Sequence, residues 1–156
     1  ELLTMSKGQS AYNISEIHED IVENDPQGVF FCGYPIFKEI YHLEARKSVR
    51  AESPENLLLL TLEGKSDDPR ELAEFRVRQS MSAMETTLRE CLRVGDVVAR
   101  YSDSQYIVLL PTCDHDLALL VANRIIFAFY DKGEKYKNVK VRTNIEEVSM
   151  SGEFVD

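Results

Sequence analysis

Arg93 and Asp96 are the two residues of this 156-residue sequence whose types and spacing point most directly to ligand chemistry. A guanidinium can hold a phosphate group or a guanine edge through two parallel hydrogen bonds, and a carboxylate can accept hydrogen bonds from guanine nitrogens. A structural explanation is equally available, because Arg93 complements a helix C-terminus, Gly95 breaks that helix and Asp96 begins the next element. The spacing therefore leaves two interpretations open, a ligand site and a helix end.

The other residue types that carry chemistry show no useful spacing. Cys32, Cys91 and Cys113 are odd in number, far apart and free of any CxxC or Cys/His pattern, which is typical of reduced structural thiols. The three histidines are scattered without partners, and no serine lies in a nucleophile motif. These residues therefore predict neither a zinc site nor an activated nucleophile.

Composition limits the classes of function. With 156 residues and 44% hydrophobic content, the chain is long enough for one domain with a core and too short for two of ordinary size. A formal net charge of -9 argues against binding to a nucleic-acid backbone or an anionic membrane, since both need clustered cations. No apolar run approaches the roughly 18 residues of a membrane span. We expect a cytoplasmic segment of a longer protein.

Residues 1–28 are acidic and loosely patterned, and we expect them to form an N-terminal helical connector. Within them, Asn13 can cap a short helix with Glu16 three residues later. Isoleucines then recur at helical spacing, at Ile14, Ile17 and Ile21. This apolar stripe predicts that the connector helix docks on a neighbouring part of the protein.

Strands and helices alternate from residue 29 onward. A short apolar run at 29–32 predicts a strand, and apolar spacing from Ile36 predicts a helix that runs to about Arg50. The continuous apolar run at 57–62 is too short for a typical helix and is bounded by turn residues. We therefore predict a strand buried on both faces, at the centre of the sheet.

A long helix follows this strand. Asp68 supplies a capping carboxylate, Pro69 suits the first helical position, and Gly95 provides the end. Its expected core-facing stripe consists of Ala73, Val77, Met81, Met84, Leu88 and Cys91.

The remaining sequence predicts a hairpin, a helix and a final strand. The runs 96–101 and 105–110 are rich in β-formers and separated by three polar residues, which is hairpin spacing. A helix begins near Asp114, and 139–148 alternates well enough for one strand or a pair of strands. We expect the domain to occupy 29–148 and a polar tail to occupy 149–156.

The stretches on either side of the hairpin turn resemble those of the GGDEF domain, the diguanylate cyclase domain. Residues 88–101 are similar to the run that leads into the family's signature, and 106–111 to the run that leaves it. The resemblance covers roughly residues 30–148. It implies an α/β (α+β) fold of the palm-like nucleotide-cyclase type, with a central, mostly antiparallel sheet flanked by helices.

In active members of that family, two glycines let the backbone approach the substrate phosphates. An acid at the third position of the signature joins an aspartate at the end of the first core strand to hold two divalent cations. Other residues occupy all these places here. Ser102 and Asp103 stand in place of the glycines, Ser104 of the acid, Gln105 of the next glutamate, Tyr106 of the phenylalanine, and Thr61 of the strand aspartate.

The resemblance therefore implies an inactive member. Nucleotide condensation needs a metal to neutralise the triphosphate and activate the attacking hydroxyl, so we expect no catalytic residue, no metal and no cofactor. An alternative is that Asp103 and Glu63 rebuild a metal site. Against it, side chains one position apart in a hairpin point to opposite faces. The family's guanine-contacting asparagine is also missing from 64–68.

Two further resemblances bear on partners. Arg93 and Asp96 form an Arg-x-x-Asp motif five residues before the turn, which is the spacing of the family's inhibitory site for cyclic di-GMP. Residues 30–46 resemble the tail region of large regulators that carry a bacterial transcriptional activator domain. The second likeness implies that this chain is the C-terminal part of such a regulator, with DNA recognition upstream.

Three functions follow as hypotheses. The first is a catalytically inactive regulatory or dimerisation module of a larger bacterial signalling or transcription regulator. Its partners would be other domains of the same protein or a second copy, with no direct contact to nucleic acid or membrane. The second is a cyclic di-GMP receptor that uses Arg93 and Asp96. The third is a residual nucleotide-processing enzyme.

Overall fold

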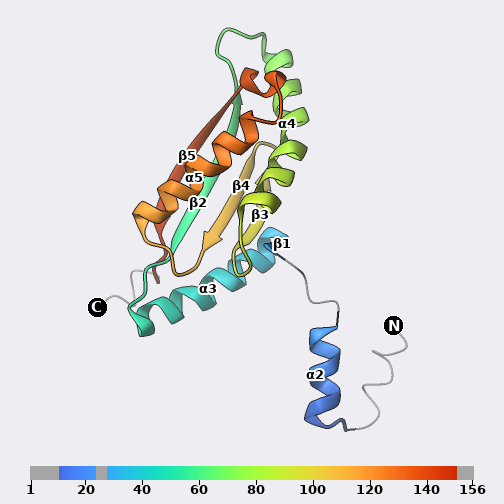
Figure 1. Ribbon diagram of the computed structural model, residues 1–156, viewed down its shortest axis with the longest axis vertical. Helices are drawn as coiled ribbons and strands as arrows, with labels where there is room; N and C mark the ends of the chain where they lie inside the picture. Colours follow the sequence, from blue (N-terminus) through green and yellow to red (C-terminus); the bar gives the residue numbers. More distant parts are fainter. Residues whose placement is uncertain (1–10, 24–27, 151–156) are drawn as a thin grey trace.

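The computed structural model describes residues 11–23 and 28–150, whose helices and strands alternate as the sequence predicts (Figure 1). A short 3-10 helix, Glu134–Asn138, precedes the last strand. The main elements are α2 (Ile14–Val22), β1 (Phe30–Cys32), α3 (Tyr34–Ala51), β2 (Asn56–Gly64), α4 (Arg70–Cys91), β3 (Val97–Ser102), β4 (Gln105–Leu110), α5 (His115–Tyr130) and β5 (Val139–Glu147).

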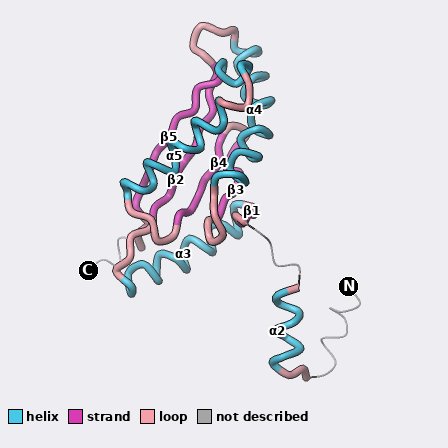
Figure 2. Tube along the Cα trace, viewed as in Figure 1, coloured by secondary structure: helices cyan, strands magenta, loops and turns pink. Residues whose placement is uncertain are grey.

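The strands form one mixed sheet in the order β1-β3-β4-β2-β5 (Figure 2). β1 pairs with β3 in parallel, whereas the other three pairings are antiparallel. The predicted α/β fold with a mostly antiparallel sheet is therefore confirmed. The prediction that 57–62 is the central strand is wrong, because β4 holds that place and β2 lies between β4 and β5.

The two faces of the sheet are covered unequally. α4 and α5 lie side by side on one face, where Leu58, Leu60 and Leu62 of β2 are fully buried (Figure 1). Among the helices in the described part of the chain, α3 is the one that packs on the opposite face, and there Leu57 and Leu59 are only half-buried. The prediction that β2 is buried on both faces is thus too strong, because a single helix cannot cover the whole second face.

The ends of α4 differ from those that the sequence indicates. Pro69 is the N-cap and the first helical residue is Arg70, with no side-chain cap. Asp68 instead accepts a hydrogen bond of 2.7 Å from Arg76, because a charged partner is available in the second turn of the helix. The helix ends at Cys91, so Gly95, with a φ of +102°, shapes the following turn rather than the helix end. The predicted core stripe is confirmed at Val77, Met81, Met84 and Leu88.

The other predicted caps are present. Asn13 Oδ1 accepts from the Glu16 backbone N–H at 2.9 Å, and Glu16 Oε1 accepts from the Asn13 N–H at 3.0 Å, which completes a capping box at α2. Asp114 Oδ1 accepts from the Leu117 N–H at 2.9 Å at the start of α5. Residues 139–147 form one strand rather than two.

α2 buries none of its residues in the described part of the chain, although the sequence predicts that it docks on a neighbour. Within residues 11–23 and 28–150, no helix has the length and apolar character needed to cross a membrane.

Candidate functional site

The hairpin turn between β3 and β4 lies against the end of β2. Thr61 pairs in register with Gln105, and the Leu62 backbone N–H donates to the Ser104 carbonyl at 2.9 Å. The turn and the strand end come together because β2 and β4 are antiparallel neighbours. The structure thus joins Thr61 to the turn residues 102–106, as the resemblance implies.

Uncharged hydrogen bonds link the side chains at this junction. Gln105 Nε2 donates to Thr61 Oγ1 at 3.2 Å, and Ser102 Oγ donates to Gln105 Oε1 at 2.8 Å. The Ser104 backbone N–H donates in turn to Ser102 Oγ at 3.3 Å. The carboxamide of Gln105 is therefore used at both ends, and no carboxylate takes part in the network.

Glu63 and Asp103 are the carboxylates nearest to this junction. Glu63 forms an ion pair with Arg142 of β5, and Asp103, whose side chain is fully exposed, lies 3.8 Å from Arg100. Each acid is thus paired with its own arginine. In the described part of the chain, no group of three or more His, Cys, Asp or Glu side chains is placed to hold a metal ion.

A cavity of about 420 Å³ opens between the turn, the end of β2 and the first turns of α4. Gly64 is one of its lining residues, and a Cβ added there would lie 2.3 Å from the Ala73 Cβ, so this close approach of β2 and α4 requires glycine. Acids outnumber bases among the lining residues, which are Leu62, Glu63, Gly64, Ala73, Glu74, Val77, Arg78, Asp103 and Ser104. Each of these three acids forms an ion pair with an arginine: Glu63 with Arg142, Glu74 with Arg70 and Asp103 with Arg100.

Tyr106, the last residue of the turn segment, serves the core. Its ring is buried and its hydroxyl donates to the Met81 carbonyl of α4 at 3.0 Å. Burial raises the pKa of the Tyr106 hydroxyl above its ordinary value. The side chain therefore ties β4 to α4 and is not available to a ligand.

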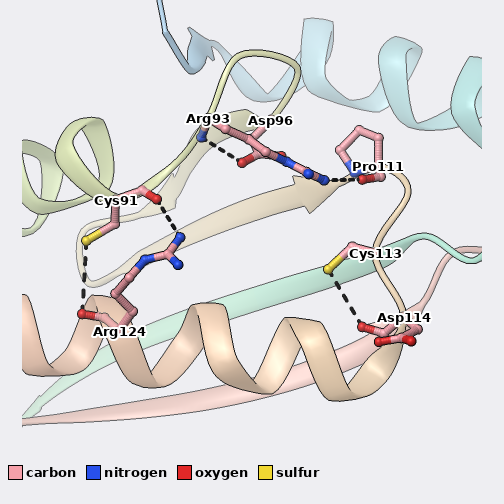
Figure 3. A network of polar contacts seen from close by, with 7 residues as sticks. All are labelled: Cys91, Arg93, Asp96, Pro111, Cys113, Asp114 and Arg124. Atoms are coloured by element: carbon pink, nitrogen blue, oxygen red, sulfur yellow. Dashed lines mark hydrogen bonds and ion pairs between the residues drawn. The ribbon is translucent and has the colours of Figure 1, made fainter.

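Arg93 and Asp96 bind each other in the loop after α4 (Figure 3). Asp96, which is buried, accepts from the Arg93 backbone N–H at 2.9 Å through Oδ2 and from Arg93 Nε at 3.3 Å through Oδ1. Arg93 Nη2 donates to the Pro111 carbonyl at 2.6 Å. Both carboxylate oxygens of Asp96 thus hold the loop closed, whereas the Arg93 side chain remains 56% exposed.

The three cysteines are free thiols, and burial raises the pKa of each. Cys91 also takes part in a contact between α4 and α5, because its carbonyl accepts from Arg124 Nη2 at 2.8 Å (Figure 3). Their placement agrees with the structural role that their spacing indicates.

A second cavity was not foreseen from the sequence. It measures about 410 Å³ and lies between α3 and the partly covered face of the sheet, with Tyr34, Tyr41 and Tyr101 in its wall. The half-buried Leu57 and Leu59 also line it. The sequence feature that could have indicated this cavity is the uninterrupted leucine run at 57–60. That run does not show which face of the strand lacks a second covering helix.

The fold and the placement of the hairpin define a GGDEF-like α/β domain, and solved structures support this class. A DGC protein from Thermotoga maritima matches with a TM-score of 0.61 at 16% identity, over 80% of this chain and 88% of that one. The GGEEF domain of a diguanylate cyclase from Vibrio cholerae matches with a TM-score of 0.58 at 9% identity, over 72% and 73% of the two chains.

A third structure is that of the diguanylate cyclase SiaD in complex with its activator SiaC from Pseudomonas aeruginosa. It matches with a TM-score of 0.58 at 16% identity, over 72% of this chain and 45% of that one. Neither a protein-family model nor a curated protein matches the sequence. The resemblance to GGDEF domains is thus confirmed for the fold.

Proposed function

We propose that this chain is a catalytically inactive GGDEF-like module that serves a regulatory or dimerisation role in a larger bacterial signalling or transcription regulator. The observation that carries the proposal is the uncharged network that joins Thr61, Gln105 and Ser102. Hydroxyl and amide groups stand where the resemblance implies the carboxylates that hold two divalent cations.

The electrostatics of the neighbouring cavity support the same conclusion. Transfer at a nucleoside triphosphate depends on cations that neutralise the phosphates and position the attacking oxygen. Here the carboxylates Glu63, Glu74 and Asp103 line the cavity and Arg78 is the single basic residue in its wall. Each of these carboxylates forms an ion pair with an arginine, which makes it less available as a metal ligand.

Incubation with GTP and either Mg²⁺ or Mn²⁺, followed by separation of the nucleotides, tests the absence of catalysis. We expect GTP to remain unchanged. Turnover that disappears in Asp103→Ala but persists in Asp67→Ala, a matched aspartate outside the cavity wall, would establish the residual enzyme instead.

A role in protein assembly has three supports. Residues 30–46 resemble the tail region of regulators with a bacterial transcriptional activator domain, and SiaD, which has a similar fold, is a cyclase seen in complex with an activator protein. In addition, α5 exposes apolar side chains at helical spacing, namely Leu117, Leu120 and Phe127. We propose that a second copy packs on this stripe.

Sedimentation equilibrium tests the dimer. We expect a dimer that Leu120→Glu dissociates and that Leu72→Glu, at an exposed apolar position of α4, leaves intact. A wild-type chain that stays monomeric at tens of micromolar, or a dimer unaffected by Leu120→Glu, would reject this interface.

The alternative function is a cyclic di-GMP receptor. The exposed part of the Arg93 guanidinium favours it, whereas the use of both Asp96 oxygens inside the loop opposes it. Titration calorimetry with cyclic di-GMP tests whether the chain is such a receptor. A heat of binding that vanishes in Arg93→Ala and persists in Arg46→Ala would support the receptor function. No heat of binding at tens of micromolar protein would reject it.

A further inference from the structure

Glu55, the residue immediately before β2, is a buried acid with an incomplete set of partners. It is only 5% exposed, and its Oε1 is buried without a hydrogen-bond partner in the described part of the chain. An ionised carboxylate in such a place is costly unless a cation or several donors surround it. The position of Glu55 before β2 therefore does not by itself explain why its carboxyl group is buried.

A second carboxyl group, that of Glu44 on α3, acts on Glu55: after burial, its negative charge and a side-chain hydrogen bond raise the pKa of Glu55. Two carboxyl groups form such a bond when one of them carries a proton. Lys47 Nζ lies 3.1 Å from Glu44 Oε2, on the outer side of the pair, and its side chain is largely exposed. One exposed ammonium thus faces two largely buried acids.

The pair joins α3 to the ends of two strands. The Glu55 carbonyl accepts from the Val148 N–H at 2.9 Å, just beyond β5. One turn earlier on α3, the Tyr41 hydroxyl donates to the Ser149 carbonyl at 2.9 Å and accepts from the Ser149 N–H at 3.1 Å.

The other charged groups near these strand ends are at the surface. Glu146 and Glu147 of β5 are exposed, as is Asp114 beyond β4. The charges that act on Glu55 are therefore those of Glu44 and Lys47, both on α3.

We propose that Glu44 and Glu55 share one proton, and that its release to solvent in the neutral pH range loosens the C-terminal half of α3 from the sheet. With the proton in place, the pair carries one negative charge, which Lys47 balances. Without it, two negative charges repel each other across the contact between α3 and β2, and one of them is buried.

The proton of this pair is released near neutral pH. Burial, followed by the negative charge of Glu44, raises the pKa of Glu55 from its ordinary 4.5 to about 7, while Lys47 lowers it. Because α3 is the one helix of residues 11–23 and 28–150 that packs on this face of the sheet, its attachment also determines how far the cavity beside Tyr41 is closed. This regulation is separate from the proposed function and does not depend on it.

Carbon-detected NMR titration of the glutamate carboxyl groups tests the shared proton in the wild-type chain. We expect Glu55 to titrate between about pH 6 and 8, and Glu39, an exposed glutamate of α3, serves as the comparison. Titration of Glu55 near 4.5 would overturn the proposal, whatever the variants do.

Hydrogen exchange tests the release of α3. After correction for intrinsic rates, we expect protection of residues 43–51 to fall on the order of tenfold from pH 5.5 to 8.5 in the wild type and in Glu39→Gln. Glu55→Gln, which is neutral at all pH values, should keep this protection constant. A fall of equal size in Glu55→Gln would overturn the proposal, and Glu44→Gln provides the same comparison if Glu55→Gln does not fold.

Discussion

The side chain of Gln105 donates a hydrogen bond of 3.2 Å to Thr61, a residue 44 positions earlier in the chain. This bond joins the hairpin turn to the end of β2 without any charge. Ser102 completes the arrangement by donating to the other end of the same carboxamide. The position at which GGDEF-like proteins would gather carboxylates around cations is thus held together by neutral donors and acceptors.

Gln105→Ala should therefore lower stability without affecting the core. The substitution removes two side-chain hydrogen bonds that are part-buried, and we expect a loss of about 1 to 2 kcal/mol in the free energy of unfolding. Urea denaturation measures the change, and Gln79→Ala at an exposed position of α4 is the control. Equal midpoints for Gln105→Ala and the wild type would show that the network contributes nothing.

Asp96→Ala should destabilise the chain more than Arg93→Ala does. Asp96 is buried and holds the Arg93 N–H and Nε, so its loss leaves the loop after α4 without its acceptor, at a cost of about 2 to 4 kcal/mol. Arg93 is half exposed, and its removal should cost less. Thermal unfolding compares the two variants. Unchanged stability in Asp96→Ala would favour a ligand-binding role over the structural one.

Gly64→Ala should disrupt the contact between β2 and α4. The new Cβ would lie 2.3 Å from the Ala73 Cβ and 2.7 Å from its Cα, so the backbone has to move. We expect a loss of about 1 to 3 kcal/mol. Gly33→Ala is the matched control, because its Cβ would meet nothing closer than 3.7 Å. Denaturation midpoints that fall equally in both variants would contradict the steric explanation.

Stability should fall as the pH rises through neutrality. An acid whose pKa is raised in the folded state binds its proton more tightly there than in the unfolded chain. The stabilisation by protonated Glu55 is therefore complete below its unfolded pKa of 4.5 and is lost as the pH rises through about 7. At about 1.4 kcal/mol per pKa unit, the loss is at most about 3 kcal/mol.

The variant Lys47→Met provides a second test of this pH dependence. Because Lys47 lowers the pKa of Glu55, its removal should move the loss of stability to higher pH. The shift should be modest, since the lysine side chain is largely exposed and screened. Urea denaturation at pH 5, 6, 7 and 8 measures both effects. A wild-type profile that rises between pH 5 and 8, or a downward shift in Lys47→Met, would contradict this reasoning.

Local patterns predicted most of the elements. The capping box at Asn13 and Glu16 and the start of a helix at Asp114 were both predicted correctly, because a helix start involves a side chain and a backbone group three residues apart. Asp68 was predicted wrongly, because Arg76 offered it a charged hydrogen bond that competes with capping. Such competition depends on the path of the loop before α4.

The candidate site could be predicted only in part. Residues 102–104 were predicted as a hairpin connection, and Thr61 was assigned to the signature stretch 102–106 through the resemblance to GGDEF domains. The orientation of side chains was beyond the sequence, which shows neither that Gln105 contacts Thr61 nor that Asp103 contacts Arg100. These contacts depend on strand register and on the bulge between Arg100 and Ser102.

The sequence by itself determined the helices, the strands and the hairpin, because hydrophobic periodicity and turn chemistry act over a few neighbouring residues. It also determined that hydroxyl and amide side chains occupy the turn and the strand end that faces it. Only the tertiary structure decided that β4 takes the centre of the sheet, that α3 is the one described helix on the second face, and that Glu44 acts on Glu55. Burial and charge are set by segments distant in the chain, and these meet only when the sheet and its helices are assembled.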